Sequence, residues 1–176
     1  MGDRAEGTAV TARTISFRLA PIEVQHLAAL IDQLTEVIAA ADGHPDPAVD
    51  RLVPAPYPDD PDAAEAFAAA TRDDLLDRRT ADAAIVRGAL SPFLDGDDDP
   101  DDEREHVDVA IRVVDIDSWL RTITALRLVI AGRLGITIDD EHDLDDPRFG
   151  VYDWLAYRLD GLIAIADGLD DARDQA

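Results

Sequence analysis

The most apolar helical pattern in the chain runs from Val114 to Ile136, where apolar residues recur every three or four positions. That spacing places them on one face of an α-helix. The apolar positions are Ile116, Trp119, Leu120, Ile123, Leu126, Ile130 and Leu134. Asp115 or Asp117 can cap the start of this helix, and Gly135 stands where a left-handed residue would end it. We expect this segment to be the central helix of a small helical domain.

Two further helical stripes precede this segment. The first spans residues 21–41 and starts with a proline, which suits the first turn of a helix. Its apolar face comprises Leu27, Leu30, Ile31, Leu34, Val37 and Ile38. The second spans residues 61–92 and follows Asp60, which can cap it. We expect this second helix to break and restart over residues 71–74.

A last helical stripe begins near Phe149 and ends near Gly168. Its apolar positions are Phe149, Val151, Tyr152, Leu155, Leu159, Leu162, Ile163, Ala166 and Leu169. This face is wide and is aromatic at its start. Because Trp154, Leu155 and Tyr157 cannot all face one core, a homodimer formed through this helix is one expectation.

Two short segments alternate apolar and polar residues instead, over residues 9–19 and 107–114. Such alternation predicts β-strands with one buried face. An isolated hairpin is marginally stable, so the two strands must pack on the helices as a small ribbon. The predicted fold class is therefore mainly α, a compact helical bundle of about four to five helices with a two-stranded β ribbon.

The chain length of 176 residues suits a single domain over residues 1–176 that can bury a core of its own. Five segments fall outside the periodic patterns. We expect a disordered tail at 1–8, a proline-rich connection at 43–60, an acidic disordered loop at 95–105, an acidic connection at 139–149 and a frayed tail at 170–176.

Charge limits the kind of partner this protein can have. The formal net charge is −23, and all 16 basic residues are arginine. A field of this sign repels phosphate backbones, so we do not expect direct nucleic-acid binding, whereas a basic protein partner is favoured. A chain rich in Asp, Ala and Arg is also what a GC-rich genome encodes, so the composition constrains the partner without naming it.

Cysteine and long apolar runs are both absent from the sequence. Without cysteine the chain forms no disulfide, no thiolate zinc site and no thiol redox centre. No apolar run reaches the length of a membrane span, and the first residues lack the apolar core of a signal peptide. We therefore expect a cytoplasmic protein that does not enter a membrane.

The sequence contains none of the common catalytic or metal-binding motifs. None of the three serines lies in a nucleophile elbow, no glycine-rich phosphate loop occurs, and no two of the four histidines have helical ligand spacing. The acidic run from Asp95 is similar to a calcium loop, but Pro100 and His106 stand where that loop requires glycine and glutamate. We expect no enzyme activity, no cofactor and no metal.

Arginines in the apolar stripes are candidate functional residues, since an isolated buried charge is costly. We expect Arg127 or Arg133 to pair with an acid such as Asp153 or Asp160. The alternative is an Arg/Asp-lined groove between the central and last helices. The full set of candidate interaction or pairing residues is Tyr57, Trp119, Arg127, Arg133, Tyr152, Asp153 and Trp154.

Three stretches resemble a known family in the family's own order: Arg51–Leu75, Trp119–Ile136 and Tyr152–Leu162. On these stretches the chain resembles the actinobacterial family named domain of unknown function 2017. The resemblance implies a gene typically close to that of the protease adaptor ClpS, and some members are described as transcriptional regulators. It carries over no catalytic residue. A regulatory mechanism that uses cysteine redox chemistry is excluded here, because this chain has no cysteine.

These observations favour a non-enzymatic regulatory or adaptor protein that acts through protein–protein interaction. It would present its helical faces around Tyr57, Trp119 and Trp154 to an unidentified, basic partner. One alternative is a small-ligand binder or enzyme with the Arg/Asp-lined pocket. Another is a transcriptional regulator that acts through a protein partner or through DNA, for which Arg78, Arg79 and Arg87 are the available basic cluster.

Overall fold

A computed structural model describes residues 13–41, 44, 46–53, 56–57, 59–94, 105–137 and 145–174. The elements in chain order are β1 (Thr14–Leu19), α1 (Pro21–Ala40), α2 (Pro47–Asp50), α3 (Pro61–Leu90), β2 (Val107–Arg112), α4 (Ile116–Leu134) and α5 (Gly150–Asp174). Short 3₁₀ turns lie at Ser91–Phe93, Val113–Asp115 and Pro147–Phe149. The predicted mainly α bundle with a small ribbon is confirmed.

Some predicted segments lie outside the described residues. They are the tail at 1–8, nearly all of the acidic loop at 95–105, and residues 139–144 of the acidic connection at 139–149. In the part of the chain that the structure describes, no helix is both long enough and apolar enough to cross a membrane.

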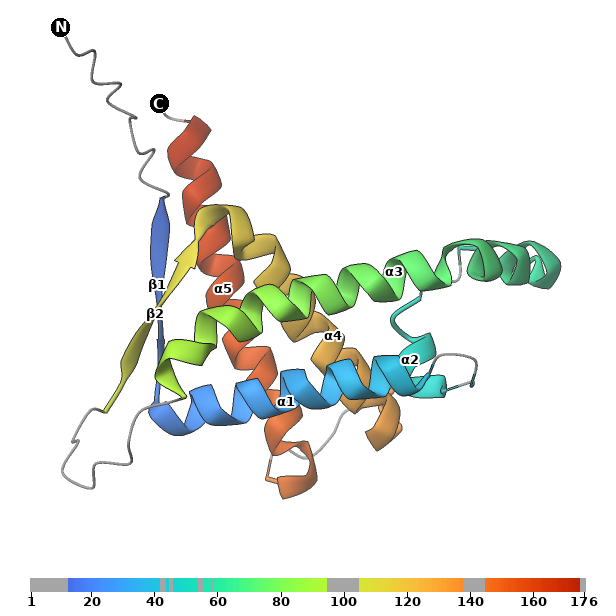
Figure 1. Cartoon of the computed structure of the whole chain (residues 1–176), viewed down its shortest axis with the longest axis horizontal. Coiled ribbons are helices and arrows are strands. Elements are labelled where there is room, and N and C mark those ends of the chain that lie inside the picture. Colours follow the sequence, from blue (N-terminus) through green and yellow to red (C-terminus); the bar gives the residue numbers. More distant parts are fainter. Residues whose placement is uncertain are drawn as a thin grey trace, which may run out of the picture.

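Helix α4 lies at the centre of the bundle. It packs against α1, α2, α3 and α5, and Figure 1 shows α1 and α3 side by side with α4 and α5 behind them. Trp119 and Ile123 of α4 have no exposed surface. The prediction that this segment is the central helix is therefore confirmed, and the helix begins at Ile116, directly after Asp115, one of the two predicted cap residues.

The two ends of α4 differ in how they are capped. Gly135 has a φ of 74°, the left-handed conformation that glycine adopts without strain, and it ends the helix as predicted. Asp115 occupies the N-cap position but makes no side-chain cap bond. Its carboxylate accepts a hydrogen bond from Arg112 Nε at 2.5 Å instead, so the start of α4 is tied to the end of β2.

The ribbon pairs β1 with β2 in antiparallel register, with Phe17 opposite Val109. The Phe17 ring meets the Trp119 ring edge to face, with 5.7 Å between centroids, so the ribbon packs on α4. The predicted second strand, 107–114, is too long, because Val113–Asp115 forms a 3₁₀ turn that leads into α4. Residues 9–12 of the predicted first strand, 9–19, lie outside the described residues.

Helix α3 is continuous, so the break predicted over residues 71–74 is wrong. Asp60 caps the helix by accepting from the Ala63 N–H at 3.0 Å. No proline or glycine interrupts residues 71–74, and the Thr71 hydroxyl bonds back to the Phe67 carbonyl at 2.8 Å within the helix. The N-terminal part of α3 extends beyond the rest of the bundle (Figure 1).

Two other boundaries differ from the sequence prediction. The connection at 43–60 contains the one-turn helix α2, which Asp46 caps by accepting from the Ala48 N–H at 2.9 Å. Helix α5 continues to Asp174, past its predicted end at Gly168 and into the segment 170–176. A glycine inside a helix costs only about 1 kcal/mol, which is too little to end it.

Helix α2 crosses α4 at Gly132. A Cβ atom added there would lie 2.9 Å from the Cα of Ala48 and 3.0 Å from its Cβ. Contacts this short require backbone movement, so the missing side chain lets the two helices approach one another.

A Gly132→Ala substitution should therefore destabilise the protein by about 1–3 kcal/mol through overpacking. The matched control is Gly88→Ala in α3, where an added Cβ meets no atom within 4 Å. That variant should be stabilised by up to about 1 kcal/mol, because alanine is the better helix former. Urea unfolding of both variants measures the difference. Equal stability of the two variants would contradict the close approach of α2 to α4.

Candidate functional site

An apolar pocket of about 430 Å³ opens between α1 and α5. Its lining residues are Glu23, His26, Ala29, Leu30, Gln33, Gly150, Val151 and Trp154. Binding sites for small molecules or for side chains are concave, mostly apolar and of this size. The start of α5 lies beside α1, where Trp154 bonds Glu23, and the helix packs mainly against α4. We refer to it as the α1–α5 pocket.

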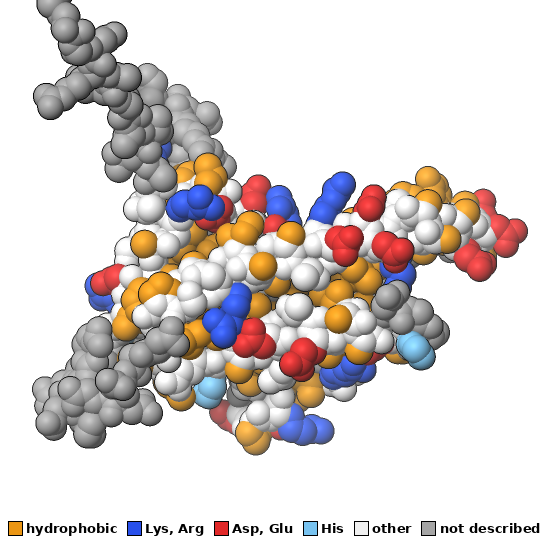
Figure 2. Space-filling model, viewed as in Figure 1, with side chains coloured by type: hydrophobic (Ala, Val, Ile, Leu, Met, Phe, Trp, Pro, Cys, Tyr) orange, Lys and Arg blue, Asp and Glu red, His pale blue; other side chains and the backbone are white. Residues whose placement is uncertain are grey.

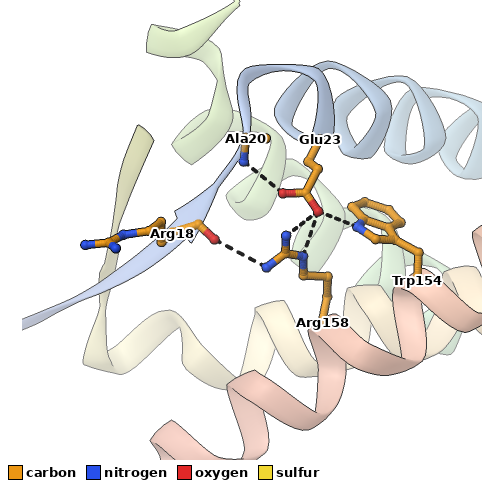
Figure 3. Close-up of polar contacts among 5 residues, drawn as sticks. All are labelled: Arg18, Ala20, Glu23, Trp154 and Arg158. Carbon is orange, nitrogen blue, oxygen red and sulfur yellow. Dashed lines mark hydrogen bonds and ion pairs between the residues drawn. The ribbon is translucent and has the colours of Figure 1, made fainter. Parts of the chain in front are cut away.

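One wall of the α1–α5 pocket is held by a polar network centred on Glu23 (Figure 3). Glu23 Oε1 accepts hydrogen bonds from Trp154 Nε1 at 2.6 Å and from Arg158 Nε at 3.0 Å, and it forms a salt bridge with the Arg158 guanidinium. Glu23 Oε2 accepts from the Ala20 N–H at 2.8 Å. Arg158 also donates to the Arg18 carbonyl at 3.4 Å. The network joins β1 and α1 to α5, and we call it the Glu23 clamp.

The Glu23 carboxyl is strongly biased toward its ionised form. Burial raises its pKa, but the hydrogen bonds from Arg158, Ala20 and Trp154 and the positive charge of Arg158 lower that pKa from 4.5 to about 2. The carboxylate is therefore charged at neutral pH, and both of its oxygens are engaged. A group in this state holds helices together and is poorly suited to transfer protons.

Glu23 could be recognised from the sequence only in part. A Glu three residues after a helix start is typical of a capping box, and Glu23 bonds the backbone of Ala20 in that way. Ala20 has no side-chain oxygen to return the bond, so the pattern is incomplete. Arg158 lies 135 residues away in the sequence, and nothing in the local pattern identifies it as the partner.

The predicted aromatic residues end up in three different environments. Trp119 is fully buried, so the expectation that it presents a face to a partner is wrong. Its position on the central stripe of α4 faces the other helices. Trp154 is half-buried and lines the α1–α5 pocket. Tyr57 is 47% exposed and packs edge to face on Phe67 of α3, with 6.1 Å between ring centroids.

The two candidate arginines, both on α4, contact different residues. Arg133 forms a salt bridge with Asp46 at 2.5 Å, so one of the two does pair with an acid, although the acid is neither Asp153 nor Asp160. The Arg127 guanidinium stacks over the Tyr152 ring, 4.5 Å from its centroid. The sequence could not identify Asp46 as the partner of Arg133, because the crossing of α2 over α4 is a tertiary contact.

The α1–α5 pocket is lined by none of four predicted candidates, Arg127, Arg133, Tyr152 and Asp153. Arg87, from the basic cluster considered for DNA, is bonded to Asp32 of α1 at 2.9 Å. Among the residues with a described position, no three His, Asp or Glu side chains are placed to hold a metal ion together.

The Glu23 clamp should make stability depend on pH. Because the folded pKa lies below the unfolded value of about 4.5, the contribution is complete above that pH and is lost as the pH falls toward about 2. A Glu23→Gln variant should lose about 2 kcal/mol of unfolding free energy at neutral pH. The difference from wild type, measured by urea unfolding, should shrink as the pH is lowered through this window.

The control for this comparison is Glu36→Gln. Glu36 lies on the same helix, is exposed and has no hydrogen-bond or ion-pair partner in the described part of the chain. Its replacement should change stability by less than about 0.5 kcal/mol at any pH. A Glu23→Gln variant that behaves like Glu36→Gln would show that the clamp contributes nothing.

Comparison with known proteins gives one match. The family model described as "Domain of unknown function (DUF2017)" matches residues 4–166. No curated protein and no solved structure matches the chain. The family match covers nearly the whole chain, including both helices that form the α1–α5 pocket. The chain therefore belongs to the DUF2017 family, domain of unknown function 2017.

Proposed function

We propose that this protein is a non-enzymatic adaptor or regulator, and that its α1–α5 pocket receives apolar side chains of a protein partner. The observation that carries the proposal is the pocket itself, whose walls are mainly apolar and whose single carboxylate is already bonded within the protein. Activity in the cytoplasm, as expected from the sequence, is part of the same proposal.

Exposed apolar surface next to the pocket favours a macromolecular partner. Val151 lines the pocket and is 47% exposed, and Ile22, the neighbour of Glu23 on α1, is 54% exposed. Exposed apolar residues beside an apolar concavity are typical of interaction surfaces. Covering them gains about 25 cal/mol for each Å² of apolar surface removed from water.

The side chains in the pocket favour binding over catalysis. None of the eight lining residues is a serine, threonine, cysteine or lysine, so no side chain there is a ready nucleophile. Glu23 is held ionised by the clamp and has no free oxygen directed to chemistry. His26 is the remaining titratable residue of the lining, and a single histidine without a nucleophile or metal supports no common hydrolytic mechanism.

Charge favours a basic protein over a nucleic acid as the partner. The net charge of −23 attracts a basic surface from a distance and accelerates encounter with it. The same field opposes binding to a phosphate backbone. A role in transcription, if the protein has one, would therefore act through a protein partner.

The test fills the pocket without changing the charge. Ala29 lines the pocket and is exposed, so Ala29→Trp places a large side chain in it. Gln25→Trp introduces the same side chain at an exposed position of α1 outside the pocket. The tagged full-length protein is used to capture partners from an extract of the cells that make it. We expect wild type and Gln25→Trp to retain the same stoichiometric protein, and Ala29→Trp to retain about tenfold less.

Three outcomes would overturn the proposal. Equal capture by all three proteins, or capture of no stoichiometric protein, would mean that the pocket binds no protein. A wild-type dimer in light scattering that Ala29→Trp converts to a monomer would assign the pocket to a second copy of this chain.

A further inference from the structure

A second and larger concavity lies between the C-terminal half of α1 and residues 65–80 of α3, with a volume of about 1110 Å³. Its lining residues are Thr35, Ile38, Ala39, Ala41, His44, Asp50, Glu65, Arg72, Asp73, Leu76, Asp77 and Thr80. We call it the α1–α3 trough. Figure 2 shows hydrophobic side chains in the hollow between these two helices and acidic side chains along its edges. It shares no lining residue with the α1–α5 pocket.

The floor of the trough is apolar. Ile38 and Ala41, from α1 and its C-cap, and Leu76 from α3 line the trough and belong to the hydrophobic core. The volume exceeds the range of about 300–1,000 Å³ that is usual for small-molecule sites. A concavity of this size and lining fits several side chains of a polypeptide better than it fits one small ligand.

The walls of the trough carry negative charge that no described residue neutralises. Arg72, the arginine of the lining, is bonded to Asp50 at 2.7 Å. Glu65, Asp73 and Asp77 are exposed, and within the described residues none of the three has a hydrogen-bond or ion-pair partner. Asp73 and Asp77 lie four residues apart on α3, where like charges destabilise a helix. A cationic occupant would relieve this repulsion.

We propose that the α1–α3 trough binds a basic amphipathic helix of a protein partner. The apolar face of that helix packs on the trough floor, and its lysine or arginine side chains pair with Glu65, Asp73 and Asp77. An apolar floor between two helices is the usual receptor for an amphipathic helix, and the acidic walls select a basic one. The inference rests on the proposed function in one respect, that the partner is a protein.

The binding test uses a defined probe. A synthetic peptide of about 15 residues, built from leucine and lysine so that leucines fill one helical face, is long enough to form a helix on binding. It is titrated into isotope-labelled full-length protein and followed by amide chemical shifts. We expect the shifts to concentrate at trough residues such as Thr35, Ala39 and Thr80, and the affinity to fall with added salt.

Charge variants distinguish binding in the α1–α3 trough from attraction to the net negative charge of the whole protein. The triple variant Glu65→Gln, Asp73→Asn, Asp77→Asn should bind the peptide about tenfold more weakly, which is about 1.4 kcal/mol. The matched control is Asp160→Asn, Asp167→Asn, Asp171→Asn on α5, which changes the net charge equally at exposed acids outside the trough. This control should stay within about twofold of wild type, because distant exposed charges are screened.

A steric variant tests the floor. Ala39 lines the trough and is exposed, so Ala39→Trp narrows it without changing the charge. Binding of the peptide should weaken with Ala39→Trp and not with Gln25→Trp. Circular dichroism and urea unfolding of each variant establish that the fold is intact before affinities are compared.

The inference would be overturned by equal losses in the two triple variants, by equal affinity for a scrambled peptide of the same composition, or by no binding of the amphipathic peptide. The first two results would mean that the peptide binds through the net negative charge of the protein and not through the trough. Shifts concentrated at Val151 and Trp154 would likewise reject the trough, while leaving the α1–α5 pocket as a protein-binding site. Conversely, peptide binding at the trough together with equal capture by Ala29→Trp and wild type would reject only the pocket.

Discussion

Burial of the apolar face of α4 is the constraint on which the rest of the bundle depends. The helix is covered by α1, α2, α3 and α5, and the Phe17 ring closes the remaining side of Trp119. Inside this core the Trp119 indole N–H and the Thr122 hydroxyl have no hydrogen-bond partner in the described part of the chain. Leaving these buried groups unpaired lowers the free energy of unfolding. The centre of the molecule is therefore stabilised by close packing of side chains and not by polar bonding.

Polar bonding is concentrated instead at the places where an outer element meets its neighbours. The Glu23 clamp fixes α5 to α1, the Arg133–Asp46 pair fixes α2 to α4, and the Arg87–Asp32 pair lies between α3 and α1. Each of these contacts uses one of the few cations of a strongly acidic protein. On the wall of the α1–α3 trough, by contrast, Glu65, Asp73 and Asp77 are exposed and have no partner among the described residues.

Most of the fold followed from the hydrophobic pattern, and most of the candidate site did not. The stripes of α1 and α4 and the alternation of β2 are strong local signals, and the residues that they mark are largely buried. The aspartate–proline pair at Asp60 correctly marked a helix start, but the same pair at Asp46 was overlooked, and with it α2. Trp119 was misjudged as a surface residue although it lies on the apolar stripe of α4 between Ile116 and Ile123, which already marked it as a core position.

The site itself depends on contacts between distant parts of the chain. Glu23 and Arg158, or Asp46 and Arg133, are ordinary surface residue types in their own segments, and only the packing of the helices brings them together. The α1–α5 pocket and the α1–α3 trough are likewise spaces between elements, which no single stretch of sequence encodes.

The clamp has a consequence for when the α1–α5 pocket exists during the life of the molecule. It joins residues 135 positions apart, so the wall from α1 is synthesised well before the wall from α5. A nascent chain whose Arg158 has not yet emerged from the ribosome cannot form the Glu23 clamp and therefore has no α1–α5 pocket. Closing so long a loop also carries an entropic cost that only the complete core can offset. Recognition through this pocket would therefore report that α1 and α5 have both been synthesised and have packed together.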